Sequence, residues 1–206
     1  MNAPTANLNE PLFASAHAAI TFALNYSMQQ YDRPLMNRLA YGPAGGSGKG
    51  LSGLDGAAQA GMIRREISEL SPLDQAFVIA SVAPHQLPRQ SPAGKDDAWR
   101  INPEWHAAIH AISQDVVSSA LAGCISHRVL RLGIVSRCFG HKVVLADLAE
   151  RCNVAQNTAT NHHQRVRRYL HGARGARIDE MSMGAVERAM RRIERRLEAA
   201  QMVFTD

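Results

Sequence analysis

Residues 155–171 hold the side chains whose types and spacing say most about the chemistry this chain could do. The segment, AQNTATNHHQRVRRYLH, is rich in amide, hydroxyl and guanidinium groups and contains no acidic residue. Asn, Gln and Arg side chains can form paired hydrogen bonds with base edges in the major groove of DNA, and Thr and Arg suit phosphate oxygens. A solvated helix with no nucleic acid to contact more often carries Glu and Lys pairs. The residue types therefore favour a helix that binds double-stranded DNA.

The apolar spacing in this segment predicts which face of the helix is buried. A helix is expected over 156–170, and its predicted inner face consists of Ala159, His162 or His163, Val166 and Leu170. The other faces carry most of the predicted DNA-binding side chains, and further cations come from Lys142 and a basic connector over 171–177. The predicted DNA-binding residues are Gln156, Asn157, Thr158, Thr160, Asn161, Gln164, Arg165, Arg167, Arg168, Lys142, Arg174 and Arg177.

A shorter helix and a tight turn are expected to position that helix. The shorter helix is predicted from Val144 to Arg151, and the turn consists of residues 152–154. Asn153 stands where the backbone is expected to need a positive φ, which Asn tolerates better than most residues. Val154 is expected to fill the angle between the two helices. The buried side of the shorter helix is expected to carry Leu145, Leu148 and Ala149.

With the residues before it, this region resembles the region 4 helix-turn-helix of bacterial sigma factors. That pattern has an arginine-bearing helix, a short glycine break, a helix of small residues, and a threonine-led recognition helix followed by arginines. The matching segments here are 128–139, Gly140, 145–151 and 158–168. The resemblance implies that the last helix enters the major groove. The first helix supports it, and Ser126 is expected to cap that support helix.

Ala159, the histidine pair 162–163 and Asn153 depart from the sigma pattern, which has Val or Ile, an apolar residue and Gly there. In size and layout the chain is also similar to the Q-type late antiterminators of phages, which implies an action on RNA polymerase. The leading hypothesis is a sequence-specific DNA-binding regulator of transcription. The alternatives left open are a helical hairpin with no DNA partner, a packaging component such as a small terminase subunit, and a nucleic-acid enzyme.

Two other motifs could do chemistry, but neither completes a site. Residues 41–53, YGPAGGSGKGLSG, look like a phosphate loop, yet Pro43 replaces its first glycine and Gly50 its Ser or Thr. His106 and His110, four residues apart, could share a metal ion, but a third ligand is missing nearby. Paired carboxylates for metal-assisted cleavage are also missing. We therefore expect a protein that is not an enzyme and binds neither a cofactor nor a metal.

Charge is distributed unevenly along the chain. The net charge is +5, but residues 1–125 carry −2 and residues 126–206 carry +7. Because the basic part contains the predicted DNA-binding helix, the distribution favours a nucleic-acid partner. The three cysteines lack paired spacing and are expected to be reduced thiols in a cytoplasmic protein. Neither a signal peptide nor a membrane-spanning run is expected.

The rest of the chain predicts further helices and no strands, so the expected fold class is all-α. Ser71-Pro72 and Asn102-Pro103 each combine a helix cap with a first-turn proline. The helices expected outside the DNA-binding region span 10–30, 35–39, 54–70, 72–83, 103–122 and 185–202. The expected division is an N-terminal helical region with a flexible glycine-rich loop for partner contact over 1–98, a connecting helix over 99–125, and a DNA-binding domain with a final amphipathic helix over 126–206.

Apolar spacing also predicts the buried faces of two of these helices. The helix over 54–70 is expected to bury Ala58, Met62 and Ile67. The final helix has a short coiled-coil-like seam, for which packing within its own domain is favoured over a homodimer. Its outer face is rich in arginine, and Arg192→Ala should weaken binding to all DNA alike if Arg192 touches phosphate. The predicted seam consists of Val186, Met190, Ile193, Leu197 and Ala200.

Overall fold

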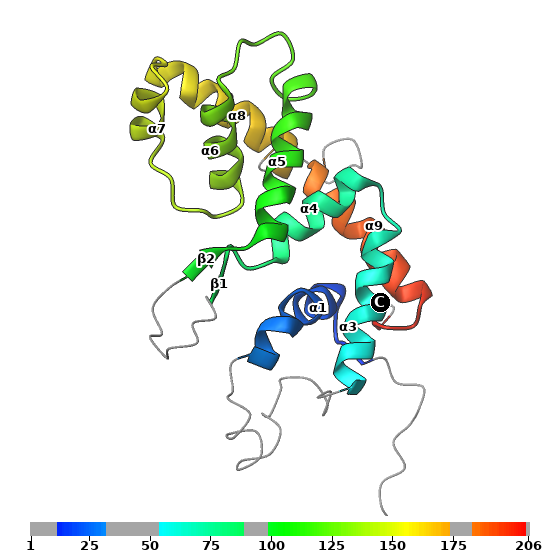
Figure 1. Cartoon of the computed structure of the whole chain (residues 1–206). Coiled ribbons are helices and arrows are strands. Elements are labelled where there is room, and N and C mark those ends of the chain that lie inside the picture. The colour runs from blue at the N-terminus through cyan, green and yellow to red at the C-terminus, as the bar shows by residue number, and fades with distance from the viewer. Residues whose placement is uncertain (1–11, 32–53, 89–98, 174–182, 205–206) are drawn as a thin grey trace, which may run out of the picture. The chain divides into compact units, whose positions relative to one another are not determined.

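The computed structural model describes residues 12–31, 54–88, 99–173 and 183–204 (Figure 1). These residues form eight helices and one two-stranded sheet, so the fold is mostly helical, as predicted. The predicted helix over 35–39, the glycine-rich loop over 41–53, Arg174 and Arg177 lie outside the described residues. In chain order the elements are α1 (Ala16–Tyr31), α3 (Leu54–Ser68), α4 (Pro72–Val82), β1 (Gln86–Pro88), β2 (Trp99–Ile101), α5 (Pro103–Ser118), α6 (Arg128–Cys138), α7 (Leu145–Arg151), α8 (Gln156–His171) and α9 (Ala185–Ala199).

Two groups of residues make most of their contacts among themselves. The first unit contains residues 1–66 and 193–206, and the second contains residues 67–192. Helices α3 and α9 each contribute to both units, because a boundary falls inside each of them. The three-part division expected from composition differs from this one, since composition does not show which distant segments touch.

In the first unit, α1 begins later than predicted. The expected start is residue 10, but the observed helix starts at Ala16. Ser15 provides the physical reason, because its Oγ accepts a hydrogen bond from the Ala18 N–H at 3.2 Å and so caps the helix. Phe13 lies before the helix, in a segment that bridges Val203. The buried residues of α1 are Ala16, Ala19, Ile20, Ala23 and Leu24.

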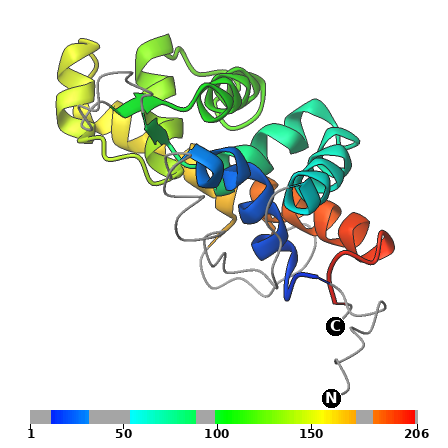
Figure 2. The ribbon, with the colours of Figure 1, turned by 60° about the horizontal axis from the view of Figure 1, so that its bottom comes forward.

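The buried face of α3 is only partly the predicted one, because Ile67 is buried as expected and the other two residues are not. Met62 is 48% exposed and Ala58 is also exposed, so the prediction was wrong for both. Apolar residues occur on more than one side of this helix, and spacing alone does not choose between them. In Figures 1 and 2 the C-terminal part of α9 runs alongside α3, where Arg196 Nε donates to Glu66 Oε2 at 3.0 Å. The residues that α3 buries are Ala60, Ile63 and Ile67.

In the second unit, α4 and α5 begin where predicted, because each has a side-chain cap followed by proline. The side chains of Ser71 and Asn102 accept backbone hydrogen bonds at 3.2 Å and 3.0 Å. Trp105 Nε1 donates to the Ala80 carbonyl at 3.2 Å, which fastens α5 to α4. The buried residues of α5 include Trp105, Ile109, Ile112 and Val116, which recur at helical spacing.

The absence of strands and the end of α5 were both predicted wrongly for this unit. The sequence predicts no strand, yet β1 and β2 form an antiparallel pair with Gln86 opposite Ile101. Each strand has three residues, which is too short for an alternating pattern to be visible. Helix α5 ends at Ser118 rather than near Gly123, and Gly123 instead adopts a φ of 75° in the turn that follows.

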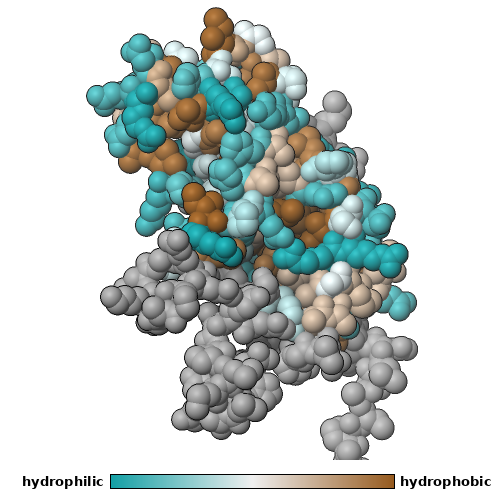
Figure 3. All heavy atoms as spheres, viewed as in Figure 1, coloured by the Kyte–Doolittle hydropathy of each residue, from teal (hydrophilic) through white to brown (hydrophobic). Residues whose placement is uncertain are grey.

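Exposed apolar side chains are scattered over this unit. Trp99 and Ile101 of β2 are 61% and 59% exposed, and Ile125 is fully exposed. In Figure 3, hydrophilic and hydrophobic residues are interspersed over the α6 and α7 part of the visible face. Single exposed apolar residues are common on protein surfaces, so by themselves they do not indicate a function.

Helix α6 is anchored through a buried arginine and not through the predicted cap. Arg131 is 8% exposed, and its Nε donates to the Ser113 carbonyl at 2.8 Å. Its Nη1 donates to Ser126 Oγ at 2.9 Å. The Ser126 hydroxyl therefore accepts from a buried guanidinium, and the expectation that it caps α6 was wrong. His127 occupies the cap position without a side-chain hydrogen bond.

The buried face of α9 is shifted from the predicted seam. Val186 and Met190 are only half-buried, and Ala200 is exposed beyond the end of the helix, which stops at Ala199 and not at residue 202. The chain itself covers the face that is buried. The buried residues of α9 are Ala185, Ala189, Ile193 and Leu197.

Arg192 forms an ion pair within its own chain, and its side chain remains 49% exposed. Its Nη1 lies 2.7 Å from Asp74 Oδ1 and 2.6 Å from Asp74 Oδ2, and the Asp74 side chain is only 10% exposed. We expect Arg192→Ala to lower the free energy of unfolding by about 1–2 kcal/mol, between the values for exposed and buried pairs, because it leaves a nearly buried carboxylate unpaired.

Urea unfolding measures this loss, and Arg191→Ala is the matched control. Arg191 pairs with Glu187 on the exposed surface of the same helix, at 3.2 Å, and its removal should cost at most about 0.5 kcal/mol. Equal losses for the two variants would contradict the structural role of the Arg192–Asp74 pair.

Candidate nucleic-acid interface

Helices α7 and α8 are joined by a tight turn with the predicted geometry. Asn153 has a φ of 51°, which confirms the expectation of a positive φ at this residue. The N–H of Val154 donates to the Ala149 carbonyl at 2.9 Å, so the turn closes directly on the end of α7. Val154 is half-buried, and α8 starts at Gln156 as predicted. The turn therefore fixes the direction in which α8 leaves α7.

The inner face of α8 is also the predicted one, and it contains His162 rather than His163. His162 is 6% exposed, whereas His163 is half-buried. The Nδ1 atom of His162 is buried and has no hydrogen-bond partner among the described residues. The buried residues of α8 are Ala159, His162, Val166 and Leu170, and those of α7 are Leu148 and Ala149.

Two glycines allow the close helix contacts that hold this arrangement. A Cβ atom at Gly133 of α6 would lie 2.4 Å from Leu148 Cδ2 of α7. A Cβ atom at Gly184, just before α9, would lie 2.2 Å from the carbonyl oxygen of Leu170 near the end of α8. Both distances are far shorter than van der Waals contact. At Gly184 the contacts are backbone atoms, so this approach requires the absence of a side chain, whereas at Gly133 the end of the Leu148 side chain would have to shift.

Tyr169 attaches the C-terminal part of α8 to α5. Its hydroxyl donates to Asp115 Oδ2 at 2.7 Å, and its ring meets Phe77 of α4 edge-on, with centroids 6.5 Å apart. Burial, followed by this hydrogen bond, raises the pKa of Tyr169 to about 12. Contacts with α5 and α4 thus help to set the orientation of α8.

The exposed surface of α8 has an outward stripe and two edges. Asn157, Asn161, Gln164 and Arg168 follow one another at spacings of four, three and four residues, so they lie along one line of the helix. All four are exposed, and they lie opposite the buried face. We call these four residues the outward stripe. By the same periodicity, one edge of the stripe carries Thr158 and Arg165, and the other carries Gln156, Thr160 and Arg167.

The arginines of α8 have few acceptors among the described residues. Arg165 Nη1 donates to the sulfur of Cys124 at 3.1 Å, and within the described parts of the chain no side-chain hydrogen bond or ion pair is found for Arg167 or Arg168. By contrast, Arg131 and Arg192 donate to oxygen atoms of their own chain. The guanidinium groups on this face of α8 are therefore available to an acceptor from outside the protein.

The remaining predicted residues lie near α8 or outside the described part. Lys142 is exposed in the segment between α6 and α7. Thr160 is half-buried, and the other predicted residues of α8 are exposed. Arg174 and Arg177 lie among residues that the structure does not describe. The structure thus brings nine predicted residues together on α8, with Lys142 on the connecting segment.

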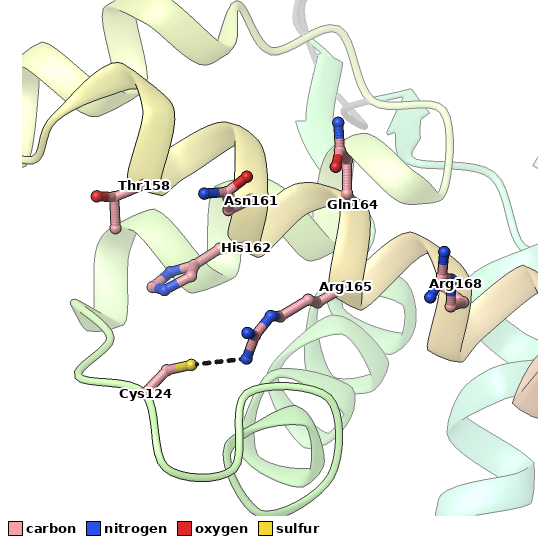
Figure 4. Close-up of a pocket in the computed structure, with 7 residues that line it drawn as sticks. All are labelled: Cys124, Thr158, Asn161, His162, Gln164, Arg165 and Arg168. Carbon is pink, nitrogen blue, oxygen red and sulfur yellow. Dashed lines mark hydrogen bonds between the residues drawn. The ribbon is translucent and has the colours of Figure 1, made fainter.

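A shallow hollow of about 480 Å³ lies beside α8, and sequence patterns gave no sign of it (Figure 4). Cys124, from the segment between α5 and α6, forms its far wall. In Figure 4, Arg165 and His162 point to the side on which Cys124 lies, whereas Gln164 points away from it. We call this the α8 hollow. Its lining residues are Cys124, Thr158, Asn161, His162, Gln164, Arg165 and Arg168.

The buried His162 should make the stability of the fold pH-dependent. Burial, followed by the charge of Arg165, lowers the pKa of His162 below its usual 6.5. The unfolded chain therefore binds a proton more readily than the folded one, and this stability contribution is lost as the pH falls from 6.5 through the folded-state pKa. The same direction holds for His163 and His110, whose pKa values are also lowered, mainly by burial.

Thermal unfolding between about pH 7.5 and pH 5.5 tests this expectation. The midpoint of the native protein should fall as the pH decreases, and His162→Gln should weaken the dependence whatever it does to stability at pH 7.5. Identical pH dependences for the two proteins would show that His162 does not contribute.

The histidine pair of α5 and the Cys138 thiol of α6 were two further candidates for a functional site. The rings of His106 and His110 lie 4.5 Å apart, but the described residues contain no group of three His, Cys, Asp or Glu side chains that could hold a metal ion. Burial raises the pKa of the Cys138 thiol to about 11, so that thiol is a poor nucleophile. Among the helices that the structure describes, none combines the length and apolar content needed to cross a bilayer.

Comparison of the chain with protein-family models, with curated proteins and with solved structures finds no match.

Proposed function

We propose that this chain is a sequence-specific DNA-binding regulator of transcription, in which α7, the turn and α8 form a helix-turn-helix. Helix α8 lies in the major groove, as the second helix of such a motif does. The outward stripe is the observation that supports this most strongly. It presents two Asn amides, one Gln amide and one guanidinium group to solvent, on a helix whose opposite face is buried.

The chemistry of the outward stripe matches the major groove. Asn and Gln pair with the N6 and N7 atoms of adenine, and Arg pairs with the O6 and N7 atoms of guanine. The edges of α8 add Arg165 and Arg167, which carry the positive charge that the DNA backbone attracts. Because α8 contains no acidic residue, no carboxylate on this helix repels the phosphates.

Selection of bound duplexes from a random-sequence pool is the experiment that tests the proposal. We expect a short enriched sequence, bound with an affinity that falls steeply as the salt concentration rises. Failure to enrich any sequence at low salt would contradict the proposed function. The mass of the protein in solution should be that of a monomer or dimer, since a ring of many copies would instead favour a packaging component.

The similarity to Q-type antiterminators extends the proposal to RNA polymerase as a partner. The face of α8 is assigned to DNA, so polymerase would bind elsewhere on the chain. Transcription in vitro from a template that carries the selected site and a downstream terminator tests this part separately. Added protein should increase read-through, and the increase should require the site. Unchanged termination would contradict an action on RNA polymerase and would leave the proposal of DNA binding unaffected.

A further inference from the structure

We propose that the α8 hollow binds one backbone phosphate of the DNA, held by Arg165 and Thr158, and that this phosphate displaces the Cys124 thiol from Arg165. The phosphate site rests on the proposed function, because it assumes that α8 lies in the major groove. It goes further by assigning Arg165 to the DNA backbone rather than to a base.

The position of Arg165 on the helix is the first reason. A helix in the major groove has base edges in front of it and a sugar-phosphate strand on either side. The outward stripe faces the bases, so side chains on the edges of α8 face the strands. Thr158 and Arg165 are seven residues apart and lie on the same edge, beside the α8 hollow. Their hydroxyl and guanidinium groups are common partners of phosphate oxygens.

The lining of the α8 hollow is the second reason. Apart from the Cys124 thiol and the Gln164 amide, which points away from Cys124, the side chains that line it can donate a hydrogen bond through an amide, hydroxyl, imidazole or guanidinium group. Two of these side chains, Arg165 and Arg168, are cations, and none of the described residues that line the hollow carries a carboxylate. A site with this many donors and this charge suits an anion with several acceptor oxygens, such as a phosphate diester.

The present acceptor of Arg165 is the third reason. The guanidinium group of Arg165 has five N–H donors. One of them donates to the Cys124 sulfur at 3.1 Å, and sulfur is a weak hydrogen-bond acceptor. The guanidinium group of Arg192 has a charged acceptor instead, because its Nη1 lies within 2.7 Å of both carboxylate oxygens of Asp74. A phosphate would offer Arg165 charged oxygens of the same kind, so exchange of thiol for phosphate is favourable.

His162 is the fourth reason. This residue lines the α8 hollow, is 6% exposed, and carries a ring nitrogen, Nδ1, that lacks a hydrogen-bond partner among the described residues. A buried polar atom without a partner costs free energy unless something satisfies it. The imidazole is therefore a polar group beside the α8 hollow whose hydrogen-bonding capacity is not fully used within the described residues.

Salt dependence separates a phosphate contact from a base contact. Arg165→Ala should weaken all duplexes alike by about tenfold and reduce the slope of log affinity against log salt by about one, with the selected sequence unchanged. Arg191→Ala removes the same charge from exposed surface on α9 and should leave the slope unchanged. A changed sequence preference for Arg165→Ala would overturn the phosphate assignment, although DNA binding itself would stand.

Replacing single DNA phosphates with uncharged groups shows which phosphate Arg165 contacts. Methylphosphonate groups replace the phosphates of the selected duplex one position at a time. The native protein should lose affinity at a particular position, and Arg165→Ala should lose nothing further there while it still responds at other positions. Losses at every position that are the same for both proteins would overturn the assignment.

Cys124 provides a matched pair of variants that leaves Arg165 intact. Cys124→Asp places a carboxylate beside Arg165, where it should occupy the guanidinium group, repel phosphate and weaken DNA binding by about tenfold. Cys124→Asn has nearly the same shape without the charge and should bind DNA much as the native protein does. Equal affinities for the two variants would contradict the proposal.

One further experiment distinguishes failure of the phosphate assignment from failure of the proposed DNA-binding function. If no duplex binds the native protein, the proposed function fails, and with it the assignment of a DNA phosphate. Inorganic phosphate is then titrated into the free protein and followed by the amide signals of residues 158–168. Saturable shifts that disappear in Arg165→Ala would show a site for a free anion in place of the DNA backbone.

Discussion

Replacing Asn157, Asn161 and Gln164 with alanine should weaken binding to the selected DNA at least about 100-fold, because each bidentate pair contributes about 1–3 kcal/mol of discrimination. The residual binding should show little sequence preference. The three side chains are exposed and lie opposite the buried face, so the variant should fold normally. A mobility-shift titration with the selected duplex and a scrambled duplex measures both effects.

Exposed amides elsewhere in the same unit provide the control. Gln86 of β1 and Gln114 of α5 are exposed and lie outside the outward stripe. Replacing both with alanine should change the affinity for the selected duplex by less than about twofold, the usual range for surface changes away from a site. If the triple variant retains native affinity and preference, α8 does not contact the bases.

Gly184→Ala should cause the largest loss of stability that this structure suggests. The added methyl group would lie 2.2 Å from the Leu170 carbonyl oxygen and 2.6 Å from the Gly172 nitrogen. Both are backbone atoms, so relief requires the start of α9 to move away from the end of α8. We expect the free energy of unfolding to fall by about 3 kcal/mol, the upper part of the range for overpacked sites.

Gly61→Ala is the matched control for this change. A methyl group at Gly61 of α3 would meet nothing within 4 Å. Alanine favours a helix interior over glycine by about 0.5–1 kcal/mol, so this variant should be slightly more stable than the native protein. Urea unfolding of the two variants gives the comparison. A Gly184→Ala protein as stable as Gly61→Ala would mean that the α8–α9 approach is looser than the structure has it.

The sequence predicted those parts of the fold that depend on neighbouring residues. Ser71 and Asn102 signalled the starts of α4 and α5, because a cap and a first-turn proline act within one helical turn. The buried face of α8 followed from apolar spacing, and the positive φ of Asn153 followed from the short turn between two helices. For the same reason the residues of the outward stripe could be named in advance.

Features that depend on distant residues could not be predicted in this way. The choice of His162 over His163 as the buried histidine is set by how α8 packs, and the two lie next to each other in sequence. The Arg192–Asp74 pair joins residues that are 118 positions apart. The contact between Arg165 and Cys124, which reveals the α8 hollow, spans 41 positions. No local pattern marks such pairs, because the fold alone brings them together.

The side-chain amide signals of the outward stripe test the central claim most directly. Asn157, Asn161 and Gln164 each have an NH₂ group that nuclear magnetic resonance detects in uniformly labelled protein. Titration with the selected duplex should shift these three signals, while the NH₂ signals of Asn102 and Gln75, which donate to carbonyl groups of their own chain, should stay in place. Saturation of the protein with DNA that leaves the three stripe signals unmoved would contradict the assignment of α8 to the major groove.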